Sequence, residues 1–222
     1  MDYRELTKNE LNDLADKYWW KPVYEFPDDF EHSLDKISSR LLYCLLRKYK
    51  PKVCLELGTY SGGSACVIIS ALQKNENDFK YIGFEKVEES RVATEQHILQ
   101  KCGLQTEIFG DITQNLDKVP QELDFVFIDC DWNKDGFPEG EIDIAKWIFE
   151  NLIPKVKKDG LVCIHDWSVN RDLVYEGGGY PGIFYFIKLF KEKKMPLEKL
   201  FAVWDEPEYK QSNIALSFWR KI

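Results

Sequence analysis

One segment limits the possible folds of this chain more than any other, because it joins a strand, a glycine-bearing turn and a helix. It reads Val53-Cys-Leu-Glu-Leu-Gly-Thr-Tyr-Ser-Gly-Gly-Ser64, and the apolar stretch Ala65–Leu72 follows it. In open α/β sheets a tight reversal of this kind brings backbone N–H groups close to a ligand. The segment therefore predicts a nucleotide pocket at the carboxyl end of the first strand.

Glu56 refines the expected ligand, because a carboxylate beside such a turn would repel a pyrophosphate. The same carboxylate suits a ligand that carries an amino group and a positive charge, as S-adenosylmethionine does. Gly58, Thr59, Gly62 and Ser64 complete the set of residues in this segment that we expect to contact that ligand.

The rest of the chain alternates expected strands and helices, a pattern typical of parallel strands with helices on both faces. The expected strands are 52–57, 81–85, 105–109, 123–129, 160–165, 199–204 and 213–219. The expected helices are 34–49, 61–74, 87–102, 142–153 and 182–193, after a first short helix at 7–18. The predicted fold class is α/β, with a doubly wound, mostly parallel seven-stranded sheet and an antiparallel last strand.

Composition excludes several classes of protein. The net charge of −8 and the pI of about 5.1 disfavour a protein that tracks nucleic-acid phosphates. The six cysteines include no Cys-x-x-Cys pair, so free thiols in a reducing compartment are the expectation. No N-terminal signal region is apparent, and no apolar run approaches the roughly 20 residues that a membrane helix needs. We therefore expect a cytoplasmic protein that binds neither nucleic acid nor membrane.

Acidic residues lie at or just beyond the carboxyl ends of five consecutive expected strands. Burying an unpaired charge is unfavourable, so apolar strands that end repeatedly in acids indicate a shared site at that edge of the sheet. A single acid there could simply cap the next helix, but five in register are harder to explain as caps. The residues are Glu56, Glu85, Asp111, Asp129 and the pair His165-Asp166.

With these residues in place, the chain resembles a class I S-adenosylmethionine-dependent methyltransferase over about residues 34–222. The resemblance implies that Glu56-Leu-Gly58 is the first motif and that Glu85 holds both ribose hydroxyls. It also implies that Asp111 meets the adenine amino group while Ile112 packs on the ring, flanked by Trp132 or Phe84. Residues 33–222 would form the methyltransferase domain, and residues 1–32 a helical extension or lid.

The rival function within the same architecture is a nicotinamide-dependent oxidoreductase. That class also places an acid after the second strand, but its fingerprint is G-x-G-x-x-G. Here the turn reads Gly58-Thr-Tyr-Ser-Gly62-Gly63, and Glu56 precedes it. The sequence also offers no second catalytic domain, so we favour the methyltransferase.

Two neighbouring strand ends resemble the metal site of O-methyltransferases of the catechol type. The likeness is greater to the branch grouped with cephalosporin-hydroxylase-like and macrolide-sugar methyltransferases. It implies that Asp129, His165 and Asp166 bind a divalent cation, with Mg²⁺ the first choice, and that Asp131 is a further ligand or supports the others. The alternative is that Asp129 orients the methionine amino group, that His165 is a core residue and that no metal binds.

One position departs from these families. Three residues beyond Asp129 they carry a lysine or histidine base, whereas this chain carries Trp132. Lys134, Asp131 or His165 could replace that base, or a metal alone could suffice. A non-catalytic or repurposed binding protein on the same scaffold is the alternative function.

The acceptor is expected to lie over the same strand ends, beneath the least regular segments of the chain. These segments are 19–30, 132–140 and 167–180, and they are rich in aromatic residues. Aromatic walls suit a small-molecule hydroxyl on a sugar, a phenol or another natural product. The run Gly177-Gly178-Gly179 could hinge a lid. The sequence leaves open whether the protein forms a homo-oligomer.

Overall fold

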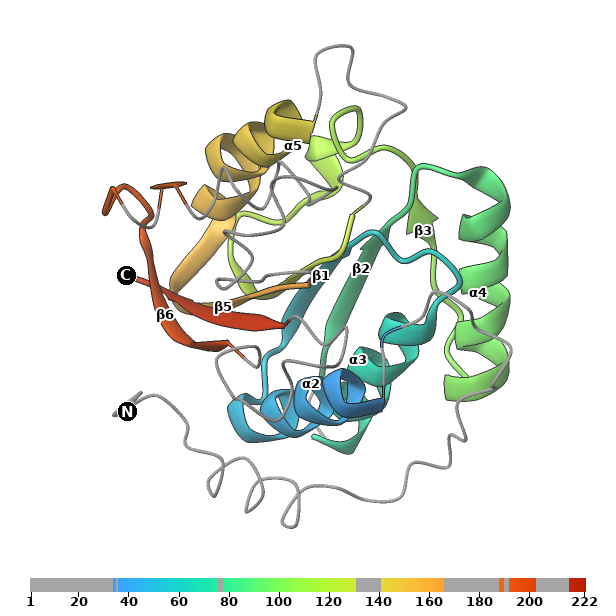
Figure 1. Ribbon diagram of the computed structural model, residues 1–222. Helices are drawn as coiled ribbons and strands as arrows, with labels where there is room; N and C mark the ends of the chain where they lie inside the picture. The colour runs from blue at the N-terminus through green and yellow to red at the C-terminus, as the bar shows by residue number, and fades with distance from the viewer. Residues whose placement is uncertain are drawn as a thin grey trace.

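A computed structural model describes residues 34, 36–75, 78–130, 141–165, 188–189, 192–202 and 216–222. The described part contains one twisted sheet with helices packed on it (Figure 1). Its strands are β1 (Val53–Leu57), β2 (Lys80–Phe84), β3 (Ile108–Phe109), β4 (Leu123–Ile128), β5 (Val156–Ile164), β6 (Leu197–Ala202) and β7 (Ser217–Lys221).

The sheet has seven strands in the order β3-β2-β1-β4-β5-β7-β6. The pairs β1–β2, β2–β3, β1–β4 and β4–β5 are parallel, and β7 is antiparallel to both β5 and β6. The predicted fold class is therefore confirmed, including the antiparallel last strand. Because the strand order reverses between β1 and β4, ligands in such a sheet bind beyond the carboxyl ends of these strands.

The helices also agree with the sequence pattern. They are α2 (Lys36–Tyr49), α3 (Gly63–Lys74), α4 (Glu88–Cys102) and α5 (Glu141–Trp147). A π-helical turn, η2 (Ile148–Leu152), and a short 3-10 helix, η3 (Ile153–Lys155), continue α5, and another 3-10 helix, η1 (Leu116–Lys118), precedes β4. Gly103 ends α4 in the left-handed conformation, with φ of 63°, which favours glycine.

Two hydrophobic cores lie on opposite faces of the sheet, because successive side chains of a strand point to opposite faces. Cys54 and Phe125 belong to the core that includes residues of α2, α3 and α4. Their neighbours Leu55 and Val126 belong to the core that includes residues of α5 and η2. The strands are thus apolar on both sides, as expected for a covered parallel sheet.

Some strands differ in length from the prediction. The third is shorter than expected: residues 105–107 join no strand, and the N–H of Ile108, its first residue, donates to the side chain of Glu95 on α4. The fifth begins at Val156, before the predicted start, because that residue pairs with Leu123 ahead of a register shift.

Other expectations fall partly or wholly outside the described residues. These are the helical extension at 1–32, most of the helix at 182–193 and the lid segments at 19–30, 132–140 and 167–180. The six cysteines are free thiols, as predicted. Among the helices of the described chain, none is long and apolar enough to cross a membrane.

Candidate functional site

The carboxyl ends of the central strands meet through backbone hydrogen bonds that continue the sheet. The N–H of Gly58 donates to the carbonyl of Phe84 at 2.9 Å, and the N–H of Asp129 donates to Leu57 at 2.8 Å. The N–H of His165 donates to the last residue of β4 at 2.9 Å. The sheet therefore brings together, along one edge, the ends of strands that are far apart in the sequence.

The turn after β1 depends on its glycines. Gly58 has φ of 87°, and a Cβ at this position would lie 2.1 Å from the carbonyl oxygen of Asp129. Gly62 has φ of 88° and caps the N-terminus of α3. Only glycine adopts such angles without strain, and only glycine allows the turn to pass so close to the end of β4. The N–H groups in the first turn of α3 have no partner within the helix and can bind an anionic group.

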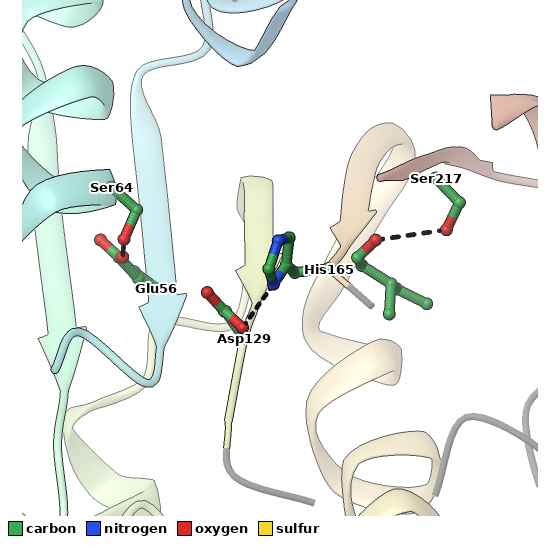
Figure 2. A network of polar contacts seen from close by, with 6 residues as sticks. Glu56, Ser64, Asp129, His165 and Ser217 are labelled. Atoms are coloured by element: carbon green, nitrogen blue, oxygen red, sulfur yellow. Dashed lines mark hydrogen bonds and ion pairs between the residues drawn. The ribbon is translucent and has the colours of Figure 1, made fainter. Parts of the chain in front are cut away.

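Glu56 lies beneath this turn rather than in it. Its side chain is fully buried, and the hydroxyl groups of Ser64 and Tyr81 donate to its two carboxyl oxygens (Figure 2 shows the contact with Ser64). Burial raises the pKa of Glu56 to about 8, with the charges of Asp129 and Glu85 adding to the rise. Burial favours the neutral acid, whereas the hydrogen bonds from Ser64 and Tyr81 favour the carboxylate. This placement differs from the expectation that Glu56 presents a charge to the ligand.

Glu85 follows β2 and is bonded to the turn. One carboxylate oxygen accepts from the N–H of Tyr60 at 2.9 Å, and the other accepts from the N–H of Val87, also at 2.9 Å. A carboxylate offers about four acceptor positions, so these two bonds leave room for two hydroxyl donors. The half-buried side chain can thus hold the turn and bind a diol at once; its contact with ribose stays a prediction.

Asp111 and Ile112 follow β3, but their side chains have different surroundings. The carboxylate of Asp111 accepts from the N–H and the hydroxyl of Thr113, at 2.8 and 2.7 Å, which stabilises its own turn. Ile112 is buried within the core beside α5, so little of its surface is available to a stacked ring. The adenine contacts expected of these two residues stay predictions.

Asp129 and His165 form a direct pair at the ends of β4 and β5 (Figure 2). Nδ1 of His165 lies 2.9 Å from Oδ1 of Asp129, and both side chains remain partly exposed. The sequence predicted that these two residues meet, and the structure brings them together. Figure 2 also shows this pair as separate from the contact between Glu56 and Ser64.

The remaining predicted site residues lie outside the described part of the chain. These are Asp131, Trp132, Lys134 and Asp166. Among the residues that the structure does describe, no group of three His, Cys, Asp or Glu side chains could hold a metal ion. The metal site and the catalytic base therefore stay predictions.

Sequence reasoning missed three residues that support the turn: Tyr81, Thr94 and His97. In the sequence Tyr81 looks like an ordinary residue of an apolar strand. Its role depends on its hydroxyl group, which donates to Glu56. Thr94 and His97 are polar, three positions apart on α4 and both buried. Polar residues three apart on a helix share one face, so this spacing was the available signal.

The comparisons with known proteins agree with this geometry. A family model described as "Methyltransferase domain" matches residues 55–167, just over half of the 222-residue chain. No curated protein matches the chain.

Solved structures share the fold at low sequence identity. One is the O-methyltransferase TomG from Streptomyces achromogenes, with a TM-score of 0.64, 15% identity, and coverage of 95% of this chain and 88% of that one. An O-methyltransferase from Bacillus cereus has a TM-score of 0.65 and 12% identity, with coverage of 97% of this chain and 92% of that one. The Podospora anserina methyltransferase PaMTH1 has a TM-score of 0.61 and 19% identity, with coverage of 95% of this chain and 88% of that one.

The family match includes the end of β1, the glycine turn and both members of the Asp129–His165 pair. The fold, including the seven-stranded sheet with its antiparallel β7, is similar to that of these solved methyltransferases, with TM-scores of 0.61 to 0.65. The chain therefore belongs to the methyltransferase domain family and has the fold of the class I S-adenosylmethionine-dependent methyltransferases.

Proposed function

We propose that this protein transfers a methyl group from S-adenosylmethionine to a hydroxyl group of a small molecule. The observation that carries the proposal is the Asp129–His165 pair, which lies at the same sheet edge as the glycine turn. The family match supports methyl transfer. The similar fold of TomG, which was solved in complex with S-adenosylmethionine and is named an O-methyltransferase, supports both the donor and the hydroxyl acceptor.

The donor would lie across the ends of β1 and β2. Glu85 would accept hydrogen bonds from the ribose, and the first turn of α3 would receive the methionine carboxylate at its free N–H groups. Gly58 allows the turn to lie close to the backbone of Asp129, so a donor bound on the turn would reach the end of β4. The methyl group would then lie near Asp129.

The reaction is an in-line displacement. The acceptor oxygen loses its proton and attacks the methyl carbon, the carbon–sulfur bond breaks, and S-adenosylhomocysteine leaves with the electron pair on sulfur. A neutral histidine whose Nδ1–H points to a carboxylate keeps Nε2 as a proton acceptor. In this proposal Asp129 orients His165, and His165 removes the proton.

A divalent metal is the second way to activate the hydroxyl. A cation bound there would lower the pKa of the hydroxyl and orient its oxygen. Adjacent ligands of a cation with bonds of about 2.1 Å lie roughly 3 Å apart, and the 2.9 Å between Asp129 and His165 fits this spacing. Asp166 would complete the set of ligands.

A titration with Mg²⁺, Mn²⁺ and Fe²⁺ separates these two possibilities. If the pair binds metal, the wild-type protein takes up one ion and Asp129→Asn takes up none. Asp117→Asn is the matched control, because Asp117 is well exposed and lies on η1. Undiminished metal affinity in Asp129→Asn would end the idea of a metal at this pair.

The transfer itself is tested by release of S-adenosylhomocysteine in the presence of catechols, other phenols and sugars. We expect at least one acceptor to react, and His165→Ala to lower kcat by about 100-fold or more while donor affinity is kept. Full activity in His165→Ala would remove this residue from the mechanism.

The second candidate function is a non-catalytic binding protein on the methyltransferase scaffold. Trp132 favours it, because it stands at the position where the O-methyltransferase families that the chain resembles carry a base. This candidate predicts that the protein binds S-adenosylmethionine, takes up no metal and methylates no acceptor.

A further inference from the structure

The turn between β1 and α3 has a backbone conformation that is not favourable by itself. Three of its five residues lie in the left-handed region: Gly58, Tyr60 and Gly62, with φ of 87°, 43° and 88°. For a residue with a side chain this conformation costs about 1 kcal/mol or more. Contacts from outside the turn must therefore hold Tyr60 in place.

Two neighbouring carbonyl groups of the turn accept hydrogen bonds from side chains of α4. The hydroxyl of Thr94 donates to the carbonyl of Tyr60 at 2.7 Å, and Nδ1 of His97 lies 2.9 Å from the carbonyl of Ser61. Because a carbonyl can only accept, His97 must donate from Nδ1. The hydroxyl groups of Thr59 and Thr94 lie 3.3 Å apart and add a third contact.

The contact between the turn and α4 is close, and the side chains that make it are buried. Thr94 and His97 are buried, and so is Thr59. A Cβ on Gly62 would lie 3.2 Å from the Cα of Thr94, so the glycine allows α4 to approach. The two bonds are partly buried, and removing a donor from a partly buried carbonyl is unfavourable, so each bond contributes to the conformation of the turn.

Tyr60 is consequently held on both sides of its backbone. Its N–H donates to Glu85, the expected ribose-binding residue, and its carbonyl accepts from Thr94. The two anchors come from different elements: Glu85 directly follows β2, and Thr94 lies in the second turn of α4. Together they set the orientation of the peptide groups that lead into the N-terminus of α3.

We propose that Thr94 and His97 are positioning residues, which hold the turn in its ligand-binding conformation before S-adenosylmethionine arrives. A turn that is already ordered does not have to be ordered on binding, and affinity improves by that difference. This inference rests on the proposed function for the identity of the ligand. The physical claim, that α4 holds the turn, stands on the contacts alone.

Four variants test the role of each donor. Thr94→Val keeps the size and branching of the side chain but removes the donor, and Thr94→Ser restores the donor. His97→Leu removes the second donor, whereas His97→Asn places an amide N–H close to the position of Nδ1. Calorimetric titration with S-adenosylhomocysteine should give roughly tenfold weaker binding for Thr94→Val and His97→Leu, and near wild-type binding for Thr94→Ser and His97→Asn.

Ile98→Val is the matched control, because Ile98 is fully buried on the same helix but belongs to the core. It should lower the thermal midpoint to a similar extent and leave affinity for S-adenosylhomocysteine unchanged. If Ile98→Val weakens binding as much as Thr94→Val does, or if Thr94→Val binds as the wild type does, the proposed positioning role is wrong.

Hydrogen exchange of the ligand-free protein gives a readout that needs no ligand. Amide exchange in residues 58–64 should become faster in Thr94→Val and His97→Leu, but not in Ile98→Val. Unchanged exchange in the first two variants would overturn the proposal. If the wild-type protein does not bind S-adenosylhomocysteine while exchange behaves as expected, the proposed function fails and the role of α4 in holding the turn remains.

Discussion

Glu56, Ser64 and Tyr81 form a buried polar group whose stability depends on one proton. The hydroxyl groups of Ser64 on α3 and Tyr81 on β2 both form hydrogen bonds with the carboxyl group of Glu56. The group therefore joins three elements of the fold, namely β1, α3 and β2, and burial favours its protonated form.

This group makes stability depend on pH in a defined direction. The pKa of Glu56 is raised from an ordinary 4.5 to about 8, so between these values the folded protein binds a proton that the unfolded chain lacks. Its stabilising contribution is full below about pH 4.5 and is lost as the pH rises through about 8, by at most about 1.4 kcal/mol per pH unit. Urea unfolding between pH 5.5 and 8.5 should show this decline.

The expected effect of Glu56→Gln is a flatter profile over that range, because an amide does not titrate. Glu122→Gln is the control, since Glu122 is exposed, and it should keep the wild-type slope. A wild-type slope in Glu56→Gln would mean that Glu56 does not titrate in this window.

Gly58→Ala tests the close passage of the turn over the end of β4. The new Cβ would meet the Asp129 carbonyl oxygen at 2.1 Å, and the backbone would keep an unfavourable φ of 87°. We expect a loss of about 2 kcal/mol or more in the free energy of unfolding, measured in urea, together with loss of S-adenosylhomocysteine binding. A stable variant with normal affinity would show that the turn does not depend on this contact.

At the scale of elements, the start of β1 is held by the side chain of Asp124 on β4. At its start the Asp124 carboxylate accepts from the N–H groups of Lys52 and Val53, at 2.8 and 2.7 Å, and pairs with Lys157 of β5. Burial alone would raise the pKa of Asp124, but these hydrogen bonds lower it below its usual value. Its stabilising effect is therefore present above the ordinary pKa of Asp and is lost as the pH falls through the lowered value.

Asp124→Ala removes these hydrogen bonds and the ion pair with Lys157, at the edge of the sheet opposite the site. We expect it to lower the free energy of unfolding by about 1–3 kcal/mol, measured in urea at neutral pH. The affinity for S-adenosylhomocysteine should stay close to wild type, because the ligand turn lies at the other end of β1. A large loss of affinity would show that the two ends of the strand are coupled.

The sequence was sufficient to predict most elements and insufficient to predict some of their contacts. The strand at 53–57 and the helix at 63–74 follow from apolar runs and glycine signals that act locally. The face that Glu56 occupies follows from alternation with its neighbours, since Cys54 lies on the same side, but the partners that neutralise it come from α3 and β2. Such partners depend on packing between segments that are distant in the sequence.

At the scale of the whole molecule, the strand order explains why the acids were informative. Because β2, β1, β4 and β5 are parallel neighbours in the sheet, the residues after them meet at one edge, and the adjacency of β4 and β5 made the pair of Asp129 and His165 predictable. The support from α4 was not, because it depends on how closely a helix approaches a turn. The acceptor also stays unpredicted, since the aromatic segments expected to contact it lie outside the described residues.

The central claim is that this edge of the sheet binds S-adenosylmethionine through Glu85. The most direct test is calorimetric titration of S-adenosylhomocysteine into the wild-type protein, Glu85→Ala and the control Glu88→Ala, whose side chain is exposed at the start of α4. We predict micromolar-range binding for the wild type and for Glu88→Ala, and no detectable binding for Glu85→Ala. Equal affinity in Glu85→Ala and the wild type would contradict the account.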